Sequence, residues 1–502
     1  MNRDESLRTI GRGAEWDVVV IGGGATGLGS AVDAAARGYR TLLLEQGDFA
    51  QGTSSRSTKL IHGGLRYLRG GNIHLVRQAL HERGLLLRNA PDLVHRLDFI
   101  IPMYEWWESA YYRAGLAFYD LLAGSLRLGP SRHLSRRETV EQLPSLAPDR
   151  LRGGILYNDA QFDDARLTIA LAHTLSGLGG TALNYAPVVA LLKNNSGMVR
   201  GVRVRDVESS DELEIVARVV INATGVFCDA LRELDHPNRR RLIVPSQGAH
   251  VVVDSSFLPG QSALMIPRTD DGRVLFTIPW HGRVLIGTTD TPVGAPVIEP
   301  RPLASEIDFL LGHTARYLVR APSHSDVRSA FAGLRPLVDH HSGKKSASLP
   351  RDHTIEVSES GLVTITGGKW TTYRLMAEET VDVATRTGGL KPRPCTTTEL
   401  SLHVAPRLDG PPLHSALPYS AGQVTNAVRT EMARTVADVL ARRTRALILD
   451  ARAAMEVAPR VASLIAAELA RDQKWEEAEV RAFHALARGY LPEGHESPTP
   501  SM

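Results

Sequence analysis

The hydrophobic pattern near the N-terminus predicts a buried strand, then a helix and a second strand. Residues 18–21 are all β-branched, a run that is typical of a strand buried on both faces of a parallel sheet. A glycine-rich turn follows, and the alanine-rich segment 28–37 predicts a helix that stops at Gly38. Because a second apolar strand, 41–44, comes next, this segment predicts the first unit of a Rossmann-like α/β domain.

The turn between the first strand and the helix has the glycine spacing of a dinucleotide-binding motif. Gly22 permits the tight turn, Gly24 lets the backbone approach a pyrophosphate, and Gly27 lets the helix lie close to the sheet. Free N–H groups and the dipole at the helix N-terminus favour phosphate oxygens. Glu45, at the end of the second strand, is placed to accept hydrogen bonds from ribose hydroxyls and disfavours the 2′-phosphate of NADP. We interpret this unit as a dinucleotide site.

Two later segments favour FAD over NAD, although either alone has the pattern of an ordinary strand-to-loop turn. The predicted strand 218–222 ends in a turn of small residues, as is needed where a sheet passes close to a cofactor. The predicted strand 363–366 is followed by two glycines and Lys369 at the start of a helix. The helix dipole and Lys369 would stabilise negative charge at the flavin end of FAD.

Apolar patterning also predicts two regions besides the cofactor unit. The segments 248–254, 273–280 and 283–287 alternate or run apolar between turns, and they predict an antiparallel sheet that covers the flavin and excludes water. Prolines near residue 395 mark a linker, beyond which 424–447 and 451–469 have helical spacing. We expect a FAD-dependent oxidoreductase region at 15–395, followed by a C-terminal helical domain at 396–502. Within the first region, the FAD-binding parts are expected at about 15–90, 165–245 and 325–390. The substrate-binding parts are expected at about 90–165 and 245–325.

The composition, net charge and apolar runs of the chain argue against some classes of binding partner and some cellular locations. Hydrophobic residues make up 43% of the 502 residues, and the net charge of +3 is too weak to argue for nucleic acid. The two cysteines provide neither a disulfide framework nor a CxxC pair. The charged N-terminus has no apolar signal segment, and no apolar run reaches the roughly 18 residues of a spanning helix. We therefore expect an intracellular protein with no nucleic-acid partner and only peripheral membrane contact.

The segment 59–67 combines basic and proton-transfer side chains with a glycine pair, about one βαβ unit after the cofactor turn. This arrangement predicts an oxidoreductase for an anionic substrate. Planar arginine forks suit an anionic group such as a phosphate, and Arg66, Arg335 and Arg351 are the candidates. An oxidation that releases a proton also needs a proton acceptor, for which histidine is the usual group near pH 7.

His62 and His250 are the two candidate proton acceptors, and the sequence does not rank them. No further histidines or cysteines have the fixed spacing of a metal site, so we expect no metal. The arginine run 442–445 has the pattern of a helix face with ion pairs to Asp438 and Asp450.

Six motifs stand in order across nearly the whole chain, at residues 53–68, 163–167, 222–225, 286–290, 333–337 and 367–373. They resemble those of FAD-dependent glycerol-3-phosphate dehydrogenases, in the same order. The resemblance implies non-covalent FAD, oxidation of sn-glycerol 3-phosphate to dihydroxyacetone phosphate by hydride transfer to flavin N5, and transfer of electrons to membrane quinone.

The residues and the resemblance together give a set of expected site residues. Catalytic roles are expected for His62, His250, Arg335 and Lys369. Substrate binding is expected for Arg66, Tyr67, Arg335, Arg351 and Lys369. Cofactor binding is expected for Gly22, Gly24, Thr26, Gly27, Glu45, Ser54, Ser55, Lys59, His62, Gly64, Val188, Ala223, Thr224, Gly225, Gly368, Lys369 and Thr371.

Two other functions remain open at this stage. An oxidase with the same substrate would differ only in passing electrons to O2, which no motif decides. A flavin-binding protein without turnover would have no need for a phosphate pocket, and the retained basic residues argue against it.

Aromatic residues among arginines predict a surface for an anionic membrane, although buried aromatics would give the same pattern. They include Trp106, Trp107, Tyr111 and Phe118. We expect a cytoplasmic protein that is peripherally associated with the inner face of the cytoplasmic membrane, and we allow for a homodimer.

Overall fold

The first sheet is built around the first predicted strand, and it confirms the α/β class. The computed structural model describes residues 1–64, 68, 71–339, 352–404, 406 and 408–492. Strand β1 (Trp16–Ile21) pairs in parallel with β2 (Thr41–Leu44) and β10 (Glu212–Asn222). Alternate side chains of β1 enter two different hydrophobic clusters, Val18 and Val20 on one face and Val19 and Ile21 on the other. The strand is therefore buried on both faces, as its sequence predicts.

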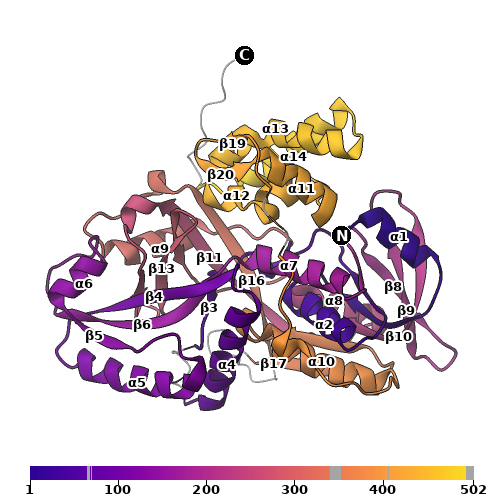
Figure 1. Cartoon of the computed structure of the whole chain (residues 1–502), viewed down its shortest axis with the longest axis horizontal. Coiled ribbons are helices and arrows are strands. Elements are labelled where there is room, and N and C mark those ends of the chain that lie inside the picture. The colour runs from indigo at the N-terminus through magenta and orange to yellow at the C-terminus, as the bar shows by residue number, and fades with distance from the viewer. Residues whose placement is uncertain (65–67, 69–70, 340–351, 405, 407, 493–502) are drawn as a thin grey trace.

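The Rossmann-like sheet has the order β17-β18-β10-β1-β2-β7, and β9 joins β8 to β10. The predicted helix after the glycine turn begins three residues early, as α2 (Ala25–Ala36), and its apolar face packs on this sheet. These elements occupy the lower right of Figure 1. The other strands are β7 (Thr181–Leu183), β8 (Val188–Lys193), β9 (Val199–Arg205), β17 (His353–Val357) and β18 (Val363–Gly367), and the other helices are α1 (Arg3–Gly11), α7 (Asp164–Gly177), α8 (Cys228–Asp235) and α10 (Tyr373–Thr387).

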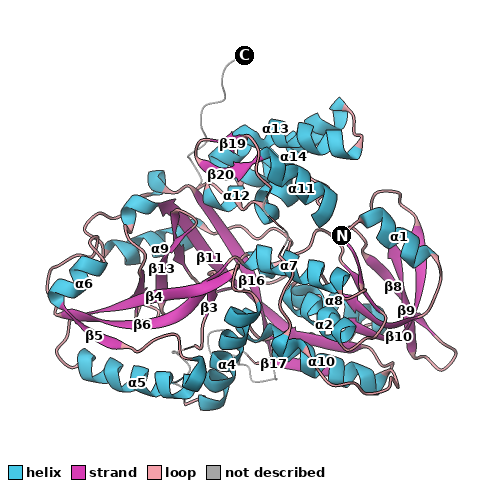
Figure 2. Cartoon of the chain, in the orientation of Figure 1, coloured by secondary structure: helices cyan, strands magenta, loops and turns pink. Residues whose placement is uncertain are grey.

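The second sheet contains the three predicted antiparallel segments and lies beside the first (Figure 2). Its order is β15-β11-β14-β13-β12-β4-β6-β3, with β16 on β11 and β5 on β6. The pair β12 and β4 is parallel, which alternation within one strand does not reveal. The strands are β3 (Leu60–Ile61), β4 (Val94–Met103), β5 (Arg132–Ser135), β6 (Gly153–Phe162), β11 (Ile243–Asp254), β12 (Ala263–Ile266), β13 (Leu275–Trp280), β14 (Arg283–Gly287), β15 (Thr291–Pro292) and β16 (Ser329–Val338), with helices α4 (Ile73–Asn89), α5 (Glu108–Ala123), α6 (Arg136–Gln142) and α9 (Ala304–Ala315).

The C-terminal helices sit on top of both sheets in Figure 1. The predicted helix 451–469 is confirmed as α13 (Ala451–Leu469), but the prediction of one helix over 424–447 is wrong. That segment is divided because Met432 and Arg445 adopt left-handed backbone conformations, with φ of 56° and 66°. The elements are β19 (Pro412–His414), β20 (Leu417–Ser420), α11 (Ala421–Glu431), the π-helix η9 (Asp438–Arg443), α12 (Ala446–Leu449), α13 and α14 (Gln473–Arg488).

Helix α5 and the two tryptophans just before it carry an exposed aromatic surface, and α5 lies on the side of the molecule away from the C-terminal helices (Figure 1). Trp106, Trp107, Tyr111 and Phe118 are all exposed, Trp106 by 78%. They are therefore not buried aromatics of the second sheet. Within the described part of the chain, no helix is both long and apolar enough to cross a membrane.

Candidate functional site

A cavity of about 630 Å³ is lined by residues of both sheets. One end lies at the carboxyl end of β1 and the N-terminus of α2, where Gly22, Gly24 and Thr26 line it. The other end reaches the second sheet at His250 and Arg335. The cavity therefore connects the predicted dinucleotide turn with two of the predicted catalytic residues.

The glycine turn leaves no room for side chains. Gly22 has a φ of +116°, and a Cβ there would lie 2.5 Å from the carbonyl oxygen of Ala223. A Cβ on Gly27 would lie 1.9 Å from the carbonyl oxygen of Gly22, and one on Gly24 would lie 2.9 Å from Ser54 Oγ. Helix α2 starts from this turn without a side-chain cap at Gly24. A cradle of this kind at a helix N-terminus fits the pyrophosphate of FAD.

Glu45 and Val188 line the part of the cavity beside β2, as expected for the ribose and adenine end. The Glu45 carboxylate accepts hydrogen bonds from the backbone N–H groups of Gly23 (2.6 Å) and Gly47 (2.8 Å). A carboxylate has about four acceptor positions, so these two bonds hold the side chain and leave capacity for two hydroxyls. Ala223, Thr224 and Gly225, at the end of β10, line the neighbouring wall.

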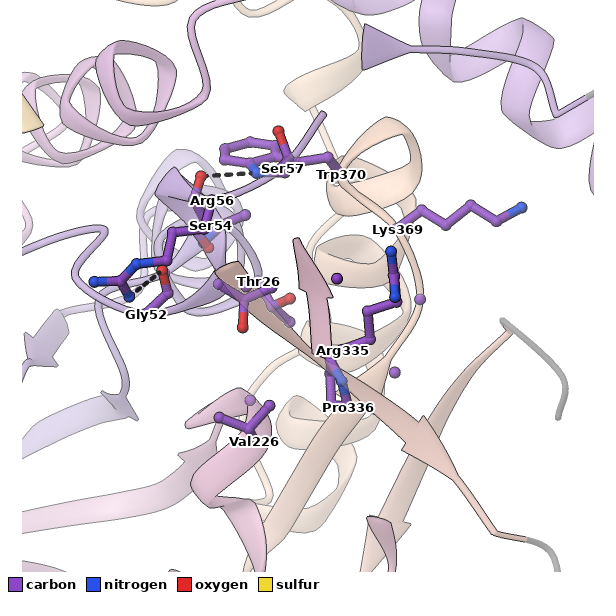
Figure 3. Close-up of a pocket in the computed structure, with 18 of the residues that line it drawn as sticks. Thr26, Gly52, Ser54, Arg56, Ser57, Val226, Arg335, Pro336, Lys369 and Trp370 are labelled. Carbon is purple, nitrogen blue, oxygen red and sulfur yellow. Dashed lines mark hydrogen bonds between the residues drawn. The ribbon is translucent and has the colours of Figure 1, made fainter. Parts of the chain in front are cut away.

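Ser54 links the two helix starts that border the cavity. Its Oγ accepts a hydrogen bond from the backbone N–H of Ala25 (2.9 Å), and its carbonyl oxygen accepts one from Trp370 Nε1 (3.0 Å), which Figure 3 draws. Ser54 belongs to the short 3-10 helix η1 (Thr53–Ser55), and Trp370 to η7 (Trp370–Thr372). The loop 53–58 is thereby held along the cavity wall.

Lys369, Gly368 and Thr371 line the cavity on the η7 side, as the sequence predicts. Gly368 has a φ of +76°, and a Cβ there would lie 2.4 Å from Met376 Sδ. Figure 3 shows Arg335 across the cavity from Thr26, Ser54 and Arg56, and the Lys369 side chain extending away from these residues. The Arg335 guanidinium therefore lies across the cavity from the dinucleotide cradle.

Arg335 projects from β16, where its guanidinium is fixed by neighbouring strands. It donates hydrogen bonds to Thr288 Oγ1 (2.9 Å) and Asp290 Oδ1 (3.4 Å). Gly248 of β11 provides the space, because a Cβ there would lie 2.3 Å from an Arg335 guanidinium nitrogen. The guanidinium is thus held in one orientation while remaining partly accessible to the cavity.

His250 is buried at the wall of the cavity, and His62 lines the same cavity. The His250 ring stacks on Phe331 with centroids 4.8 Å apart, and its Nε2 lies 2.9 Å from Thr58 Oγ1. Burial lowers the pKa of His250 well below its ordinary value, and the charges of Lys59 and Arg335 lower it further. The imidazole is therefore neutral at physiological pH. His62 is held through its backbone, which exchanges hydrogen bonds of 3.3 Å with Thr371 Oγ1.

Three expected cofactor residues lie behind the cavity wall. Gly27 packs against Gly22 inside the turn, and Ser55 and Lys59 are buried with no part in the lining. The Lys59 ammonium donates hydrogen bonds to the Ser55 carbonyl oxygen and to Asp164, both at 2.7 Å. Lys59 therefore contacts the loop and not the cavity. The expected substrate residues Arg66, Tyr67 and Arg351 lie outside the described residues.

Several residues that line or shape the cavity were not predicted from the sequence. Thr58 and Asp290 belong to two of the family-like motifs, which were the available signal, but no role was assigned to either. Asp159 has no such signal; it accepts hydrogen bonds from Arg83 (2.7 Å) and Tyr119 (2.8 Å) beside the backbone of Gly63. Among the described residues, no group of three or more histidine, cysteine or acidic side chains could hold a metal ion.

Comparison with known protein families gives two matches that together span most of the chain. Residues 17–382 match the model described as FAD dependent oxidoreductase, and residues 397–478 match that of the C-terminal domain of alpha-glycerophosphate oxidase. The mitochondrial glycerol-3-phosphate dehydrogenases of Macaca fascicularis and Homo sapiens are each 39% identical to the chain, over 97% of it and 76% of their own length.

Solved structures with a similar fold include two proteins that contain FAD. Glycerol-3-phosphate dehydrogenase from Bacillus halodurans, complexed with FAD, has a TM-score of 0.79 and 28% identity, with 99% of both chains covered. L-alpha-glycerophosphate oxidase from Mycoplasma pneumoniae, with FAD bound, has a TM-score of 0.59 and 18% identity, over 77% of this chain and 98% of its own. The second likeness concerns the fold alone.

Proposed function

We propose that this chain, which belongs to the family of FAD-dependent glycerol-3-phosphate dehydrogenases, oxidises sn-glycerol 3-phosphate to dihydroxyacetone phosphate. The observation that carries the proposal is the single cavity that runs from the glycine cradle at Gly22 to the side chains of His250 and Arg335. A cofactor seated on the cradle and a small phosphorylated alcohol beside the arginine would share that cavity.

Arg335 and Lys369 bind the substrate phosphate in this proposal. A guanidinium offers paired donors to phosphate oxygens, and hydrogen bonds to charged groups are about twice as strong as neutral ones. Thr288 and Asp290 hold the Arg335 guanidinium in place, so little side-chain entropy is lost on binding. Arg66, Tyr67 and Arg351 remain predicted substrate residues on the family resemblance.

His250 accepts the proton of the C2 hydroxyl in this proposal. Its imidazole is neutral, and Thr58 Oγ1 and the Phe331 ring fix its orientation. A fixed neutral base near its substrate typically contributes a factor of roughly 10² to 10⁴ in rate. His62 is the second candidate, and a variant of each residue separates them.

FAD, when bound, supplies the two-electron acceptor for the hydride that leaves C2, at flavin N5. The residues proposed to hold FAD are those of the glycine turn, Glu45, Ser54, the end of β10 and the η7 turn. Lys369 and the start of α10 place positive charge beside that end of the cavity. We retain the division into an oxidoreductase region, 15–395, and a C-terminal domain, 396–502, as part of this proposal.

Membrane quinone is the proposed electron acceptor, with peripheral docking at the inner face of the cytoplasmic membrane. The exposed aromatics of α5 support this proposal, because Trp and Tyr side chains favour the interface between lipid and water. Transfer to O2, as in an oxidase, is the alternative. A homodimer stays a prediction from the sequence.

Turnover of the FAD-loaded protein with a panel of substrates tests the proposed function. Reduction of an electron-accepting dye is expected with glycerol 3-phosphate and not with lactate, amino acids or glycerol. A soluble quinone should replace the dye, whereas hydrogen peroxide formed in stoichiometric yield in air would select the oxidase. Turnover with lactate or an amino acid, and none with glycerol 3-phosphate, would contradict the substrate assignment.

A further inference from the structure

We propose that the C-terminal helices brace the FAD site, and that Arg445 is the positioning residue that fixes loop 53–59 from behind. The end of η9 and the turn that follows it present Arg442, Arg443 and Arg445 to the Rossmann-like half. All three side chains are buried. The inference concerns FAD binding and does not depend on which substrate is oxidised.

Arg445 reaches the loop directly. Its guanidinium donates hydrogen bonds to the carbonyl oxygen of Ser55 (2.8 Å) and to Asp164 Oδ1 (3.0 Å). Its own helix turn anchors the other side of the guanidinium, through the Ala441 carbonyl oxygen at 2.8 Å. The left-handed backbone of Arg445, with φ of 66°, ends the preceding helical turn at this position.

Asp164 extends this contact to the rest of the loop. Its Oδ2 accepts hydrogen bonds from the Ser57 backbone N–H (3.0 Å), from Ser57 Oγ (2.7 Å) and from Lys59 Nζ (2.7 Å). Both the carboxylate and the ammonium have no exposed surface. Lys59 closes the arrangement, because it also donates to the Ser55 carbonyl oxygen that Arg445 contacts.

The front of the same loop faces the cofactor cavity. Ser54 Oγ accepts from the N-terminus of α2, and Thr58 Oγ1 contacts His250. A displacement of the loop would therefore move a wall of the cofactor cradle and the partner of His250 together. Arg445 acts on both only through the loop, since it lies behind the cavity wall.

Arg442 and Arg443 hold the segment just before loop 53–59 in the same way. Both donate to the fully buried carboxylate of Asp48, and Arg443 does so with two nitrogens, at 2.7 and 2.8 Å. Asp48 follows Glu45 by three residues, on the other segment that borders the cavity. Buried ion pairs contribute little net stability compared with apolar contacts. The pairs of Arg442 and Arg443 end on Asp48, and that of Arg445 ends on Asp164, which holds loop 53–59. They therefore indicate positioning rather than simple attachment.

Arg445→Met in the FAD-loaded full chain tests the inference, with Arg166→Met as its matched control. Arg166 makes a partly buried two-bond ion pair with Glu431 that also joins the C-terminal helices to the Rossmann-like half, at 2.8 Å, but it has no hydrogen bond to loop 53–59. We expect Arg445→Met to raise the FAD dissociation constant at least 10-fold and to speed amide hydrogen exchange across residues 53–59. Arg166→Met should lower the melting temperature by a similar amount to Arg445→Met. It should leave the FAD dissociation constant and the amide exchange of residues 53–59 as in the wild type.

Equal FAD affinity and equal exchange of the loop in the two variants would overturn the proposal. Arg445→Lys provides a milder change should the methionine variant not fold, because a lysine keeps the charge but has a single nitrogen and loses the second contact of the fork, to the Ala441 carbonyl oxygen. It should show intermediate FAD affinity and intermediate loop exchange. Wild-type values for both in Arg445→Lys would equally contradict a positioning role.

Discussion

Thr58 Oγ1 lies 2.9 Å from Nε2 of His250 and joins the loop that borders the cofactor cradle to the proposed proton acceptor. The two residues are 192 positions apart in the chain. Thr58 is therefore expected to orient the imidazole rather than to contact the substrate phosphate.

Thr58→Val should slow hydride transfer without loss of FAD. The valine has nearly the same volume but cannot hold the ring, so the limiting rate of flavin reduction should fall about 10-fold. Anaerobic stopped-flow measurement gives this rate. Thr314→Val removes a buried hydroxyl bond, to Leu310 in α9, away from the cavity, and should leave the rate unchanged. An unaltered rate in Thr58→Val would remove the orienting role.

The stability of the protein should fall below pH 6.5 in part because of His250. Burial lowers its pKa in the folded state, whereas the unfolded chain binds the proton near the ordinary pKa of about 6.5. The contribution of the neutral ring is thus fully present above pH 6.5 and is lost as the pH falls toward the folded pKa, by up to about 1.4 kcal/mol per pH unit. Burial also lowers the pKa of His173, to about 4, so the comparison requires a variant.

His250→Gln should reduce the drop in melting temperature between pH 7.5 and pH 5.5 relative to the wild type. The exposed His74 provides the control, and His74→Gln should retain the full drop. Calorimetric scans at both pH values measure the effect. A drop in His250→Gln as large as that of the wild type would show that His250 is not buried in its neutral form.

Gly248→Ala should weaken substrate binding through Arg335. The new Cβ would lie 2.3 Å from the guanidinium, and the flexible arginine would have to move. We expect the KM for glycerol 3-phosphate to rise about 10-fold in Gly248→Ala. In Arg335→Met it should rise about 10- to 100-fold, which corresponds to the loss of a charged hydrogen bond of about 1.5 to 3 kcal/mol. Gly312→Ala in α9, where a Cβ meets nothing within 4 Å, is the control. Unchanged KM in both cavity variants would place the phosphate elsewhere.

Replacement of both exposed tryptophans beside α5 should reduce membrane binding. Trp106→Ser with Trp107→Ser removes interfacial aromatics, so co-sedimentation with anionic liposomes should weaken at least about 5-fold. Val319→Ser changes an equally prominent apolar side chain, 68% exposed, outside this surface, and should bind as the wild type does. Full binding by the double variant would exclude this surface as the docking site.

The sequence predicts the cofactor unit well because its determinants are local. The apolar run of β1, the glycine turn and the apolar strand β2 lie within 30 consecutive residues. The residue types within each of these segments are enough to predict its structure. The second sheet is predicted where strands alternate, but the parallel contact of β12 with β4 joins segments more than 150 residues apart and leaves no local pattern.

The parts that sequence does not predict depend on distant partners. Lys59 resembles a cofactor ligand in the family motif, yet its ammonium points to Asp164, 105 positions away. The segment 424–447 has helical spacing throughout, but its buried arginines pair with the distant carboxylates of Asp48 and Asp164. The predicted pairing with Asp438 is confirmed for Arg442, whereas Asp450 lies near Arg283 and Arg328 instead. The roles of Arg66, Tyr67 and Arg351 stay predictions.

Anaerobic mixing of the FAD-loaded protein with glycerol 3-phosphate is the sharpest test of the shared cavity, because flavin reduction then depends only on the cofactor and the substrate, with no external electron acceptor. We predict rapid and complete bleaching of the visible flavin band by glycerol 3-phosphate and none by unphosphorylated glycerol. A polypeptide that takes up no FAD, or bound flavin that glycerol 3-phosphate leaves oxidised, would contradict it.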